Sequence, residues 1–320
     1  MSLWELADLS TPWSILVAAT LRVADHIEAG KTDIGALAAA AGADANSLER
    51  VLQHLVSKGV FEEPEPGRFA LNDAARELMT EGSRLVFNLD SLGGRMAHAW
   101  GTLLSAVRTG KPAYHAVFGR TFWEDLEAHP QIAADFDALM GPAGHGVPDP
   151  QVLVDRNEWK AIRTVVDVGG GTGSLLAEIL RAHPHVRGTL VDLPRAVTRS
   201  AEVFEKAGVA DRATAVAQSF FDPLPAAADV YLLKNVLGDW PDAQAQAILR
   251  GCAEAARPSG RVVTFGPGDK ASPELLMLVL VGGRGRSLED FRRLAQEAGL
   301  EVTAVGQQES GRSIVECRPV

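Results

Sequence analysis

A glycine-rich segment in the middle of the chain has the composition of a turn that binds a ligand through its backbone. The apolar run Thr164–Val168 ends in the turn Gly169–Gly173, and a helical pattern begins at Ser174. Glycine permits positive φ and close approach of a ligand, and the start of a helix offers unpaired N–H groups. Asp192 ends the next apolar run about 20 residues later, a distance at which an acid suits ribose hydroxyls. These residues predict a nucleotide-like ligand.

The glycine spacing distinguishes two kinds of such ligand. A dinucleotide site reads G-x-G-x-x-G, which would place the third glycine at Ser174. Here the glycines stand at 169, 171 and 173, and Asp167 precedes the first by two residues. This pattern resembles that of class I S-adenosylmethionine (SAM) methyltransferases and favours SAM.

An α/β sheet must position these residues. The expected strands are 164–168, 188–192, 212–217, 229–234 and 260–265, with a final hairpin of 301–306 and 312–318; the apolar segment 276–281 fits a helix or a strand. Alternation of strands with helical patterns predicts a Rossmann-like, mostly parallel sheet with helices on both faces. Ligands bind at the carboxyl ends of such strands, where the glycine turn, Asp192, Ser219–Phe220 and Lys234–Asn235 all lie.

The first 80 residues predict a winged-helix unit. Its segments are helices at 3–30, broken at Pro12, at 33–41, capped by Thr32, and from Asp44 or Asn46 through Lys58, then a hairpin of 60–63 and 67–71. Such units can bind DNA through basic and amide side chains on the second helix. Here the basic and amide side chains of that helix are offset by Glu49, and the wing carries Glu62, Glu63 and Glu65. We interpret the unit as a dimerisation and substrate-lid module.

Length and composition limit the number of domains, the kinds of partner and the location of the protein. The chain has 320 residues, of which 46% are hydrophobic, enough for two domains. Its net charge of −10 argues against a nucleic-acid partner. We found no apolar run of membrane-spanning length, no signal peptide and no metal-ligand spacing, and the two cysteines, Cys252 and Cys317, make no disulfide framework. The expected location is cytoplasmic, without a membrane partner.

Helical patterns connect the two ends of the chain. Helices are expected at about 84–109, 121–128 and 130–140, followed by a glycine- and proline-rich linker at 141–150. The predicted organisation is a dimerisation domain at 1–80, a helical substrate-roof and linker region at 81–160, and a SAM-binding domain at 161–320.

Several motifs together resemble one family, the winged-helix small-molecule O-methyltransferases of plant caffeate and bacterial polyketide or phenazine pathways. The matching segments are Val166–Gly173, Val191–Pro194, Ser219–Pro225, Leu233–Asp242 and Gly282–Ser287, with Thr109–Tyr114 and Phe118–Trp123 typical of the bacterial branch. The resemblance covers nearly the whole chain. It implies a class I SAM methyltransferase fold, a homodimer formed through the N-terminal domain, SAM as cofactor with S-adenosyl-L-homocysteine as product, and an aromatic small-molecule substrate of secondary metabolism.

The resemblance also implies roles for single residues at the cofactor. Gly169 and Gly171 would line the methionine part, near Asp167. Asp192 would bind the ribose hydroxyls. The adenine would contact Leu193, Ser219 and Phe220; Lys234 would contribute its backbone carbonyl, and Trp240 is either a pocket wall or a core residue.

The sequence departs from this family where the reaction needs a base. Relatives carry a histidine that takes the proton from the substrate hydroxyl, and here that position is Gly238. Two glutamates that orient the histidine in relatives are replaced by Gly285 and, in an approximate alignment, by Gly266. A positioned base contributes roughly 10²–10⁴-fold to the rate, so its loss points to a changed mechanism.

Three interpretations remain open. Methyl transfer can proceed without a dedicated base on an anionic oxygen, or on nitrogen or carbon. Alternatively, another residue acts as the base, with His145, His98, His115, Asp239 and Asn235 as candidates. Finally, the family fold can use SAM for hydroxylation, decarboxylation or a pericyclic reaction.

The expected substrate is flat and aromatic or polyketide-like. The residues expected to line its pocket are Met96, Trp100, Phe122, Phe136, Met140 and Met277, and Phe118, Trp123, Leu276 and Leu280 belong to the same apolar set. About half of this set would be core rather than pocket. Asn235 is the polar candidate for orienting a substrate oxygen, because its amide both donates and accepts hydrogen bonds.

Overall fold

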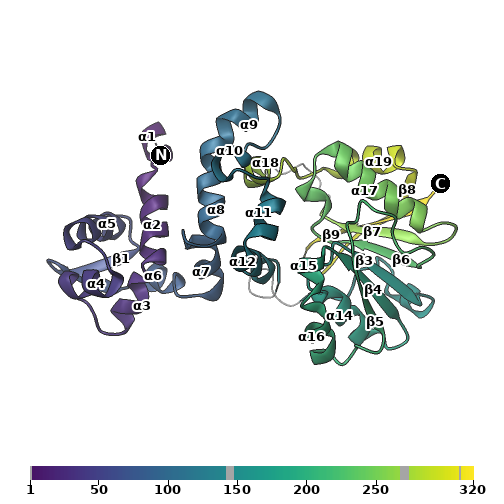
Figure 1. The fold of residues 1–320 in the computed structure, drawn as a ribbon, viewed down its shortest axis with the longest axis horizontal. Helices are drawn as coiled ribbons and strands as arrows, with labels where there is room; N and C mark the ends of the chain where they lie inside the picture. Colours follow the sequence, from purple (N-terminus) through teal and green to yellow (C-terminus); the bar gives the residue numbers. More distant parts are fainter. Residues whose placement is uncertain (1, 142–147, 267–273, 310) are drawn as a thin grey trace. The chain divides into compact units, whose positions relative to one another are not determined.

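The structure of the protein, a computed structural model, describes residues 2–141, 148–266, 274–309 and 311–320. The chain divides into two compact units, Met1–His98 with His129–Gly144, and Ala99–Ala128 with His145–Val320 (Figure 1). These units are interleaved in sequence, and the segment 81–160 contributes to both. The three-part division at residues 80 and 160 stays a prediction.

The N-terminal unit has the predicted helix, turn, helix and hairpin. Its elements are α1 (Leu3–Leu6), α2 (Ser10–Thr20), α3 (Val23–Glu28), α4 (Ile34–Ala41), α5 (Ala45–Ser57), β1 (Phe61–Glu65), β2 (Arg68–Leu71), α6 (Asp73–Glu77), α7 (Glu81–Phe87), α8 (Leu92–Ala99) and α12 (Pro130–Met140). Asp44 caps α5 by accepting the N–H of Ser47 at 2.9 Å. The prediction that Thr32 caps α4 was wrong, since Asp33 accepts the N–H groups of Gly35 and Ala36.

The long helix predicted at 84–109 is broken. It stops at Phe87, restarts at Leu92 and gives way to the 3-10 helix η1 (Trp100–Thr102) before α9 (Leu103–Thr109). A Cβ on Gly93 or Gly94 would lie 2.3 Å or 1.8 Å from a backbone oxygen of the preceding turn. The two glycines therefore permit a backbone approach that apolar periodicity did not reveal.

The C-terminal unit contains a seven-stranded sheet in the order β5-β4-β3-β6-β7-β9-β8. The strands are β3 (Thr164–Val168), β4 (Arg187–Asp192), β5 (Ala213–Ala217), β6 (Val230–Leu233), β7 (Arg261–Phe265), β8 (Leu300–Gln307) and β9 (Ser313–Pro319). The first five pair in parallel, whereas β9 is antiparallel to both neighbours. The strand predictions are confirmed, each to within one residue at either end.

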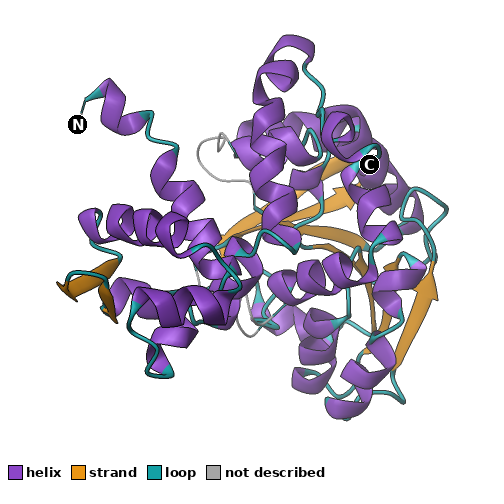
Figure 2. Ribbon diagram, turned by 60° about the vertical axis from the view of Figure 1, so that its left-hand side comes forward, coloured by secondary structure: helices purple, strands orange, loops and turns teal. Residues whose placement is uncertain are grey.

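Helices cover both faces of this sheet (Figure 2). The helices of the C-terminal unit are α14 (Ser174–Ala182), α15 (Pro194–Val197), α16 (Ser200–Lys206), α17 (Asp242–Ala255), α18 (Leu275–Leu280) and α19 (Leu288–Glu297), with η2 (Arg156–Lys160), η3 (Leu237–Asp239), α9, α10 (His115–Phe118) and α11 (Phe122–Ala128). Successive residues of β3 enter different cores. Val165 packs with residues of α14 and Val166 with residues of α17, as the alternation of side chains along a strand requires.

Candidate active site

The predicted cofactor residues gather at one edge of the sheet. The glycine turn follows β3, Asp192 ends β4, Ser219 and Phe220 follow β5, and Lys234 follows β6. Because these four strands are adjacent and parallel, their carboxyl ends meet along one edge. The site therefore follows from strand order as well as from the motifs.

The turn after β3 is built from glycines for identifiable reasons. Gly169, Gly171 and Gly173 have φ of 72°, 61° and 80°, a region that side chains other than glycine rarely adopt. A Cβ on Gly169 would lie 2.7 Å from Val236. A Cβ on Gly171 would meet no atom within 4 Å, so at that position the turn faces open space. The turn is thus a cradle whose backbone a ligand can approach.

Asp192 is bound to this cradle. One carboxylate oxygen accepts the N–H of Gly171 at 2.8 Å, and the other accepts the N–H of Leu193 at 2.7 Å. A carboxylate oxygen has two lone pairs, so it can accept a ribose hydroxyl in addition to a backbone N–H. The predicted ribose-binding geometry is therefore available at this residue.

Beneath the turn lies a buried acid. Asp167 is 1% exposed, and its Oδ2 has no hydrogen-bond partner among the described residues. A Cβ on Gly170 would approach that oxygen to 2.3 Å, which explains the glycine there. Burial raises the pKa of Asp167 to about 7; the charge of Lys234 opposes this shift and that of Asp192 adds to it. An unpartnered acceptor below the cradle fits a cofactor with cationic groups.

An aromatic wall flanks the cradle. Trp240 lies edge-on to Phe220 and Phe221, with ring centroids 5.9 Å and 5.0 Å apart, and stacks with Trp123 at 6.0 Å. The structure therefore shows Trp240 as part of a partly exposed aromatic group that includes the predicted adenine neighbour Phe220. Phe221 was not among the predicted site residues, although it belongs to the same motif.

The turn Leu237–Trp240 contains Gly238, the position at which the family resemblance implies a histidine base. Gly238 does not have positive φ, and a Cβ there would meet no atom within 4 Å, so a side chain would fit. Asp239 is partly buried; burial raises its pKa to about 7, and the charge of Glu274 adds to the shift. Gly266 differs from Gly238, since its φ of 117° disfavours any side chain.

Comparison with known proteins identifies the type of enzyme. The O-methyltransferase domain family matches residues 100–301, and the O-methyltransferase dimerisation domain family matches residues 4–81. The chain belongs to the O-methyltransferase family. The predicted family, fold class and SAM-dependent class of enzyme are confirmed, and the N-terminal unit contains a dimerisation domain.

Individual relatives of this O-methyltransferase cover nearly its full length. The 2,7-dihydroxy-5-methyl-1-naphthoate 7-O-methyltransferase of Streptomyces carzinostaticus is 43% identical over 95% of this chain and 93% of its own. Aclacinomycin 10-hydroxylase RdmB of Streptomyces purpurascens is 39% identical over 94% of this chain and 84% of its own. The crystal structure of the O-methyltransferase NcsB1 from neocarzinostatin biosynthesis, with S-adenosyl-L-homocysteine and 1,4-dihydroxy-2-naphthoic acid, has a TM-score of 0.92 at 40% identity, covering 100% of this chain and 99% of that one.

The predicted substrate-lining residues of the O-methyltransferase are divided between its two units. Met96, Phe136 and Met140 belong to the N-terminal unit; Trp100, Phe122, Asn235 and Met277 belong to the C-terminal unit. Phe122 is 4% exposed and packs edge-on against Tyr114, with ring centroids 5.5 Å apart, so it is a buried aromatic residue. The pocket role of each of these residues stays a prediction.

The candidate bases are also in different places. His145 lies outside the described residues. His98 packs against Trp13, with ring centroids 5.3 Å apart, and His115 is exposed on α10. Asn235 has φ of 56° and accepts a hydrogen bond from Arg312 at 3.3 Å. Asp239 is the candidate that adjoins Gly238 directly.

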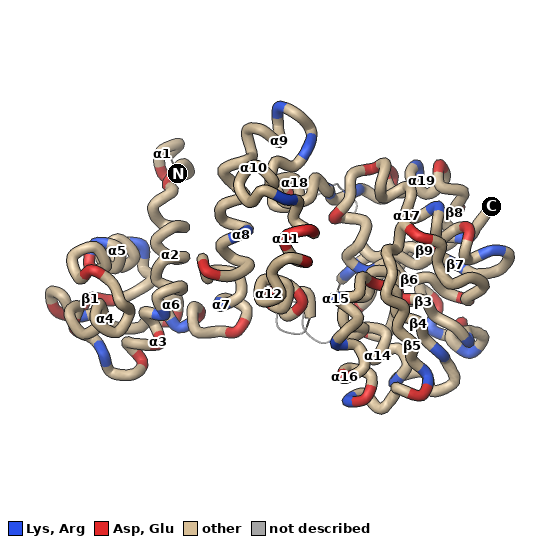
Figure 3. Tube along the Cα trace, viewed as in Figure 1, with Lys and Arg blue, Asp and Glu red and all other residues tan. Residues whose placement is uncertain are grey.

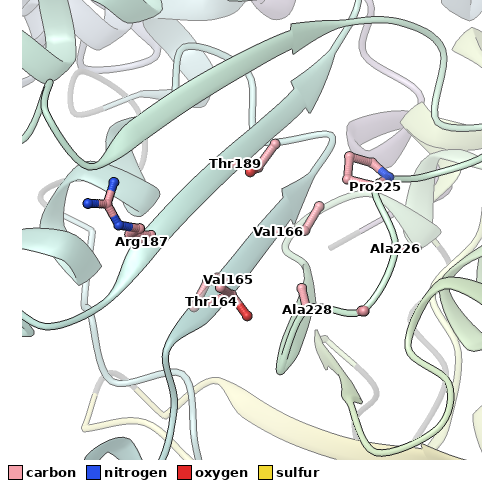
Figure 4. Close-up of a pocket in the computed structure, with 9 residues that line it drawn as sticks. Thr164, Val165, Val166, Arg187, Thr189, Pro225, Ala226 and Ala228 are labelled. Carbon is pink, nitrogen blue, oxygen red and sulfur yellow. The ribbon is translucent and has the colours of Figure 1, made fainter.

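A shallow pocket lies at the other end of the sheet. Residues near the start of β3 and β4 line it, together with Pro225–Ala228 (Figure 4). Its place at the amino ends of the strands separates it from the cofactor edge. Among the described residues no cluster of His, Cys, Asp and Glu could hold a metal ion, and no described helix is long and apolar enough to cross a membrane.

Proposed function

We propose that this O-methyltransferase transfers the methyl group of SAM to a hydroxyl oxygen of a flat aromatic or polyketide-like acceptor in secondary metabolism. The hydrogen bond from Gly171 to Asp192, which joins the glycine cradle to the acid, is the observation that carries the proposal. When bound, SAM supplies an electrophilic methyl group on a positively charged sulfur. Gly169 and Gly171 would hold its methionine part above Asp167, and Asp192 its ribose hydroxyls. Leu193, Ser219 and Phe220 would flank the adenine, and Lys234 would contribute its backbone carbonyl to the cofactor site.

The acceptor is proposed to be a fused-ring aromatic hydroxy acid. Relatives at 43% and 40% identity are described with dihydroxynaphthoic acids as substrate or bound ligand. The aromatic wall at Trp240 and Trp123 can support a planar ring by stacking. Met96, Trp100, Phe136, Met140 and Met277 stay proposed lining residues, and Asn235 a proposed contact for an acceptor oxygen.

Proton removal is proposed to occur without a histidine. The acceptor can bind as a phenolate, since an ionised oxygen needs no base. Asp239 is the alternative base, because its pKa of about 7 would make it a stronger proton acceptor than an ordinary carboxylate. His145 stays a further candidate.

The similarity to the hydroxylase RdmB supports a second candidate activity, a reaction other than O-methylation. RdmB, a hydroxylase, shares 39% identity with this chain, so the fold does not by itself specify methyl transfer. Gly238 stands where the family resemblance implies a histidine base, and glycine cannot accept a proton. Hydroxylation, decarboxylation, a pericyclic reaction, and N- or C-methylation are therefore the alternative reactions for the same cofactor site.

The location of the enzyme is proposed to be the cytoplasm. Both cysteines, Cys252 and Cys317, are buried free thiols. Burial raises the pKa of each to about 12, which keeps the thiols protonated and unreactive. Fractionation of the producing cells would test the location.

A labelling experiment tests the reaction. The protein is incubated with methyl-labelled SAM and a panel of hydroxynaphthoic acids, and both S-adenosyl-L-homocysteine and labelled product are quantified. We expect equal amounts of the two, with the label on oxygen. Turnover of an acceptor without S-adenosyl-L-homocysteine would contradict methyl transfer and favour the second activity.

A further inference from the structure

Arg286 joins the turn Leu237–Trp240 to the start of α17. Its guanidinium donates to the carbonyl of Leu237 at 2.6 Å and to the carbonyl of Trp240 at 2.8 Å. It also donates from Nε and Nη2 to one oxygen of Asp242, at 3.1 Å and 2.9 Å. Arg286 is only 6% exposed, so these bonds form largely out of water. One side chain thus holds both ends of the turn.

Gly283 makes a second contact with the same turn. A Cβ on Gly283 would lie 2.1 Å from the carbonyl oxygen of Gly238 and 2.6 Å from the carbonyl carbon of Asp239. The backbone of the two segments is therefore in direct contact, at a distance that only glycine allows. The contact and the guanidinium fork together fix the turn against the segment Gly282–Arg286.

The fixed turn contributes to two parts of the proposed site, the position of the base and the aromatic wall. It contains Gly238, where the family resemblance implies a histidine base, and Trp240, which contacts Phe220 in the aromatic wall. We propose that Arg286 is a positioning residue of this enzyme, which holds the Leu237–Trp240 turn in the place required for SAM binding and methyl transfer. The inference rests on the proposed function, because it assumes that the turn borders the cofactor.

Only arginine has the geometry that this role requires. Its planar fork presents donors in several directions at once, whereas a lysine ammonium is a single compact point charge. Arg286→Lys keeps the charge beside Asp242 but cannot serve both carbonyls in the same way. Arg286→Met removes the charge and all the donors while keeping a side chain of similar length.

Arg284 provides the matched control. It also binds Asp242, at 2.7 Å and 3.1 Å, but its side chain is 43% exposed and its hydrogen bonds among the described residues go to Asp242. Arg284→Lys and Arg284→Met therefore weaken the same ion pair without touching the two carbonyls of the turn. Comparing variants at the two positions therefore distinguishes the effect of losing an ion pair with Asp242 from the effect of displacing the turn.

The test measures cofactor binding apart from chemistry. For wild type and the four variants, Kd for S-adenosyl-L-homocysteine is measured by calorimetry, kcat and KM for SAM by turnover, and folding by thermal unfolding. We expect Arg286→Met to raise Kd and lower kcat/KM by about 10- to 100-fold. Arg286→Lys, which is expected to fold, should recover part of the loss, and both Arg284 variants should stay within about twofold of wild type.

Two results would overturn the role of Arg286. One is a folded Arg286→Lys protein with Kd and kcat/KM within about twofold of wild type. The other is an equal loss in the matched Arg284 variants. If wild type itself does not bind S-adenosyl-L-homocysteine, the proposed cofactor use fails; wild-type binding with an unaffected Arg286→Lys protein contradicts the positioning role alone.

Discussion

Gly238 differs physically from the other glycines of the site. A Cβ on Gly169, Gly170, Gly173 or Gly283 would collide with a neighbour at less than 3.0 Å, so the fold requires glycine there. Gly238 has room for a side chain and an unstrained backbone. The fold therefore does not require glycine at this position.

Introducing a histidine at Gly238 should change the pH dependence of the reaction. For a phenolic acceptor we expect the kcat/KM of the parent to rise with pH towards the phenol pKa of about 10. With Gly238→His the rise should occur near pH 6.5, and activity below about pH 8 should increase at least tenfold. Gly238→Ala is the control, since it fills space without adding a base. Identical pH profiles for the His and Ala variants would contradict this account.

Asp192 should contribute to cofactor affinity through its charge. Asp192→Asn keeps the size of the side chain but loses one acceptor oxygen and the charge that strengthens both hydrogen bonds. We expect Kd for S-adenosyl-L-homocysteine to rise by about 10- to 100-fold, the range for hydrogen bonds to a charged group. Asp211→Asn, an exposed acid at the opposite edge of the sheet, should bind as wild type does. Unchanged binding in the Asp192 variant would exclude its proposed ribose contact.

Asp167 should make the stability of the protein depend on pH. Its pKa is raised from 3.8 to about 7, so between these values the native state holds a proton that the unfolded chain has lost. The free energy of unfolding should therefore fall as pH rises through this range, by at most about 1.4 kcal/mol per pH unit, and then level off. Asp167→Asn should reduce this slope, measured by urea unfolding between about pH 5 and pH 7. An unaltered slope would show that Asp167 is ionised throughout.

At the level of elements, a buried ion pair anchors the chain before β3 to the sheet. Arg261 at the start of β7 donates to Glu316 of β9 at 2.9 Å and also contacts Glu158 of η2. Glu316 in turn accepts the N–H of Val154 at 2.6 Å. The side chains of Arg261 and Glu316 are only 10% and 5% exposed.

Removing one ion of this pair should destabilise the protein. Glu316→Gln leaves the buried Arg261 with Glu158, which is partly exposed, as its remaining carboxylate partner. We expect a loss of about 3 kcal/mol in the free energy of unfolding. Urea denaturation would measure it. Glu309→Gln, which breaks the exposed pair with Arg156, is the control and should cost less than about 0.5 kcal/mol. Equal effects of the two substitutions would show that burial adds nothing to the Glu316 pair.

At the scale of the whole molecule, the dimerisation domain exposes apolar residues at its N-terminus. Leu3, Trp4, Leu6 and Leu9 are 77%, 86%, 66% and 73% exposed in the single chain. Acidic and basic positions are interspersed along the rest of this unit (Figure 3). Apolar side chains so exposed are typical of a surface that a second subunit covers.

Charges on this surface should weaken the homodimer. We expect the double variant Trp4→Glu, Leu6→Glu to lose about 2 kcal/mol or more of dimerisation free energy, the scale of an interface tryptophan. Light scattering over a dilution series would show a monomer at concentrations where wild type is a dimer. Val320→Glu, at an exposed C-terminal position, should leave the dimer intact. A dimer unaffected by the double variant would place the interface elsewhere.

The sequence by itself determined the strands, their alternation with helices and the motifs that follow them. Strand and helix periods and glycine turns are local signals, and the carboxyl ends of parallel strands must meet along one edge once the strand order is known. The positions of the glycine turn, Asp192, Phe220 and Lys234 could be predicted for this reason. The departure at Gly238 could be recognised because the motif Leu233–Asp242 resembles the family's.

Only the tertiary structure decided which hydrogen bonds position the residues at that edge and how their pKa values are shifted. Arg286 reaches Leu237 and Trp240 across more than 40 residues of chain, and no local pattern encodes such a contact. The raised pKa values of Asp167 and Asp239 come from burial, which depends on what packs around them in three dimensions. Periodicity specifies which face of an element is apolar, whereas distances between elements and their electrostatics arise only when the faces pack together.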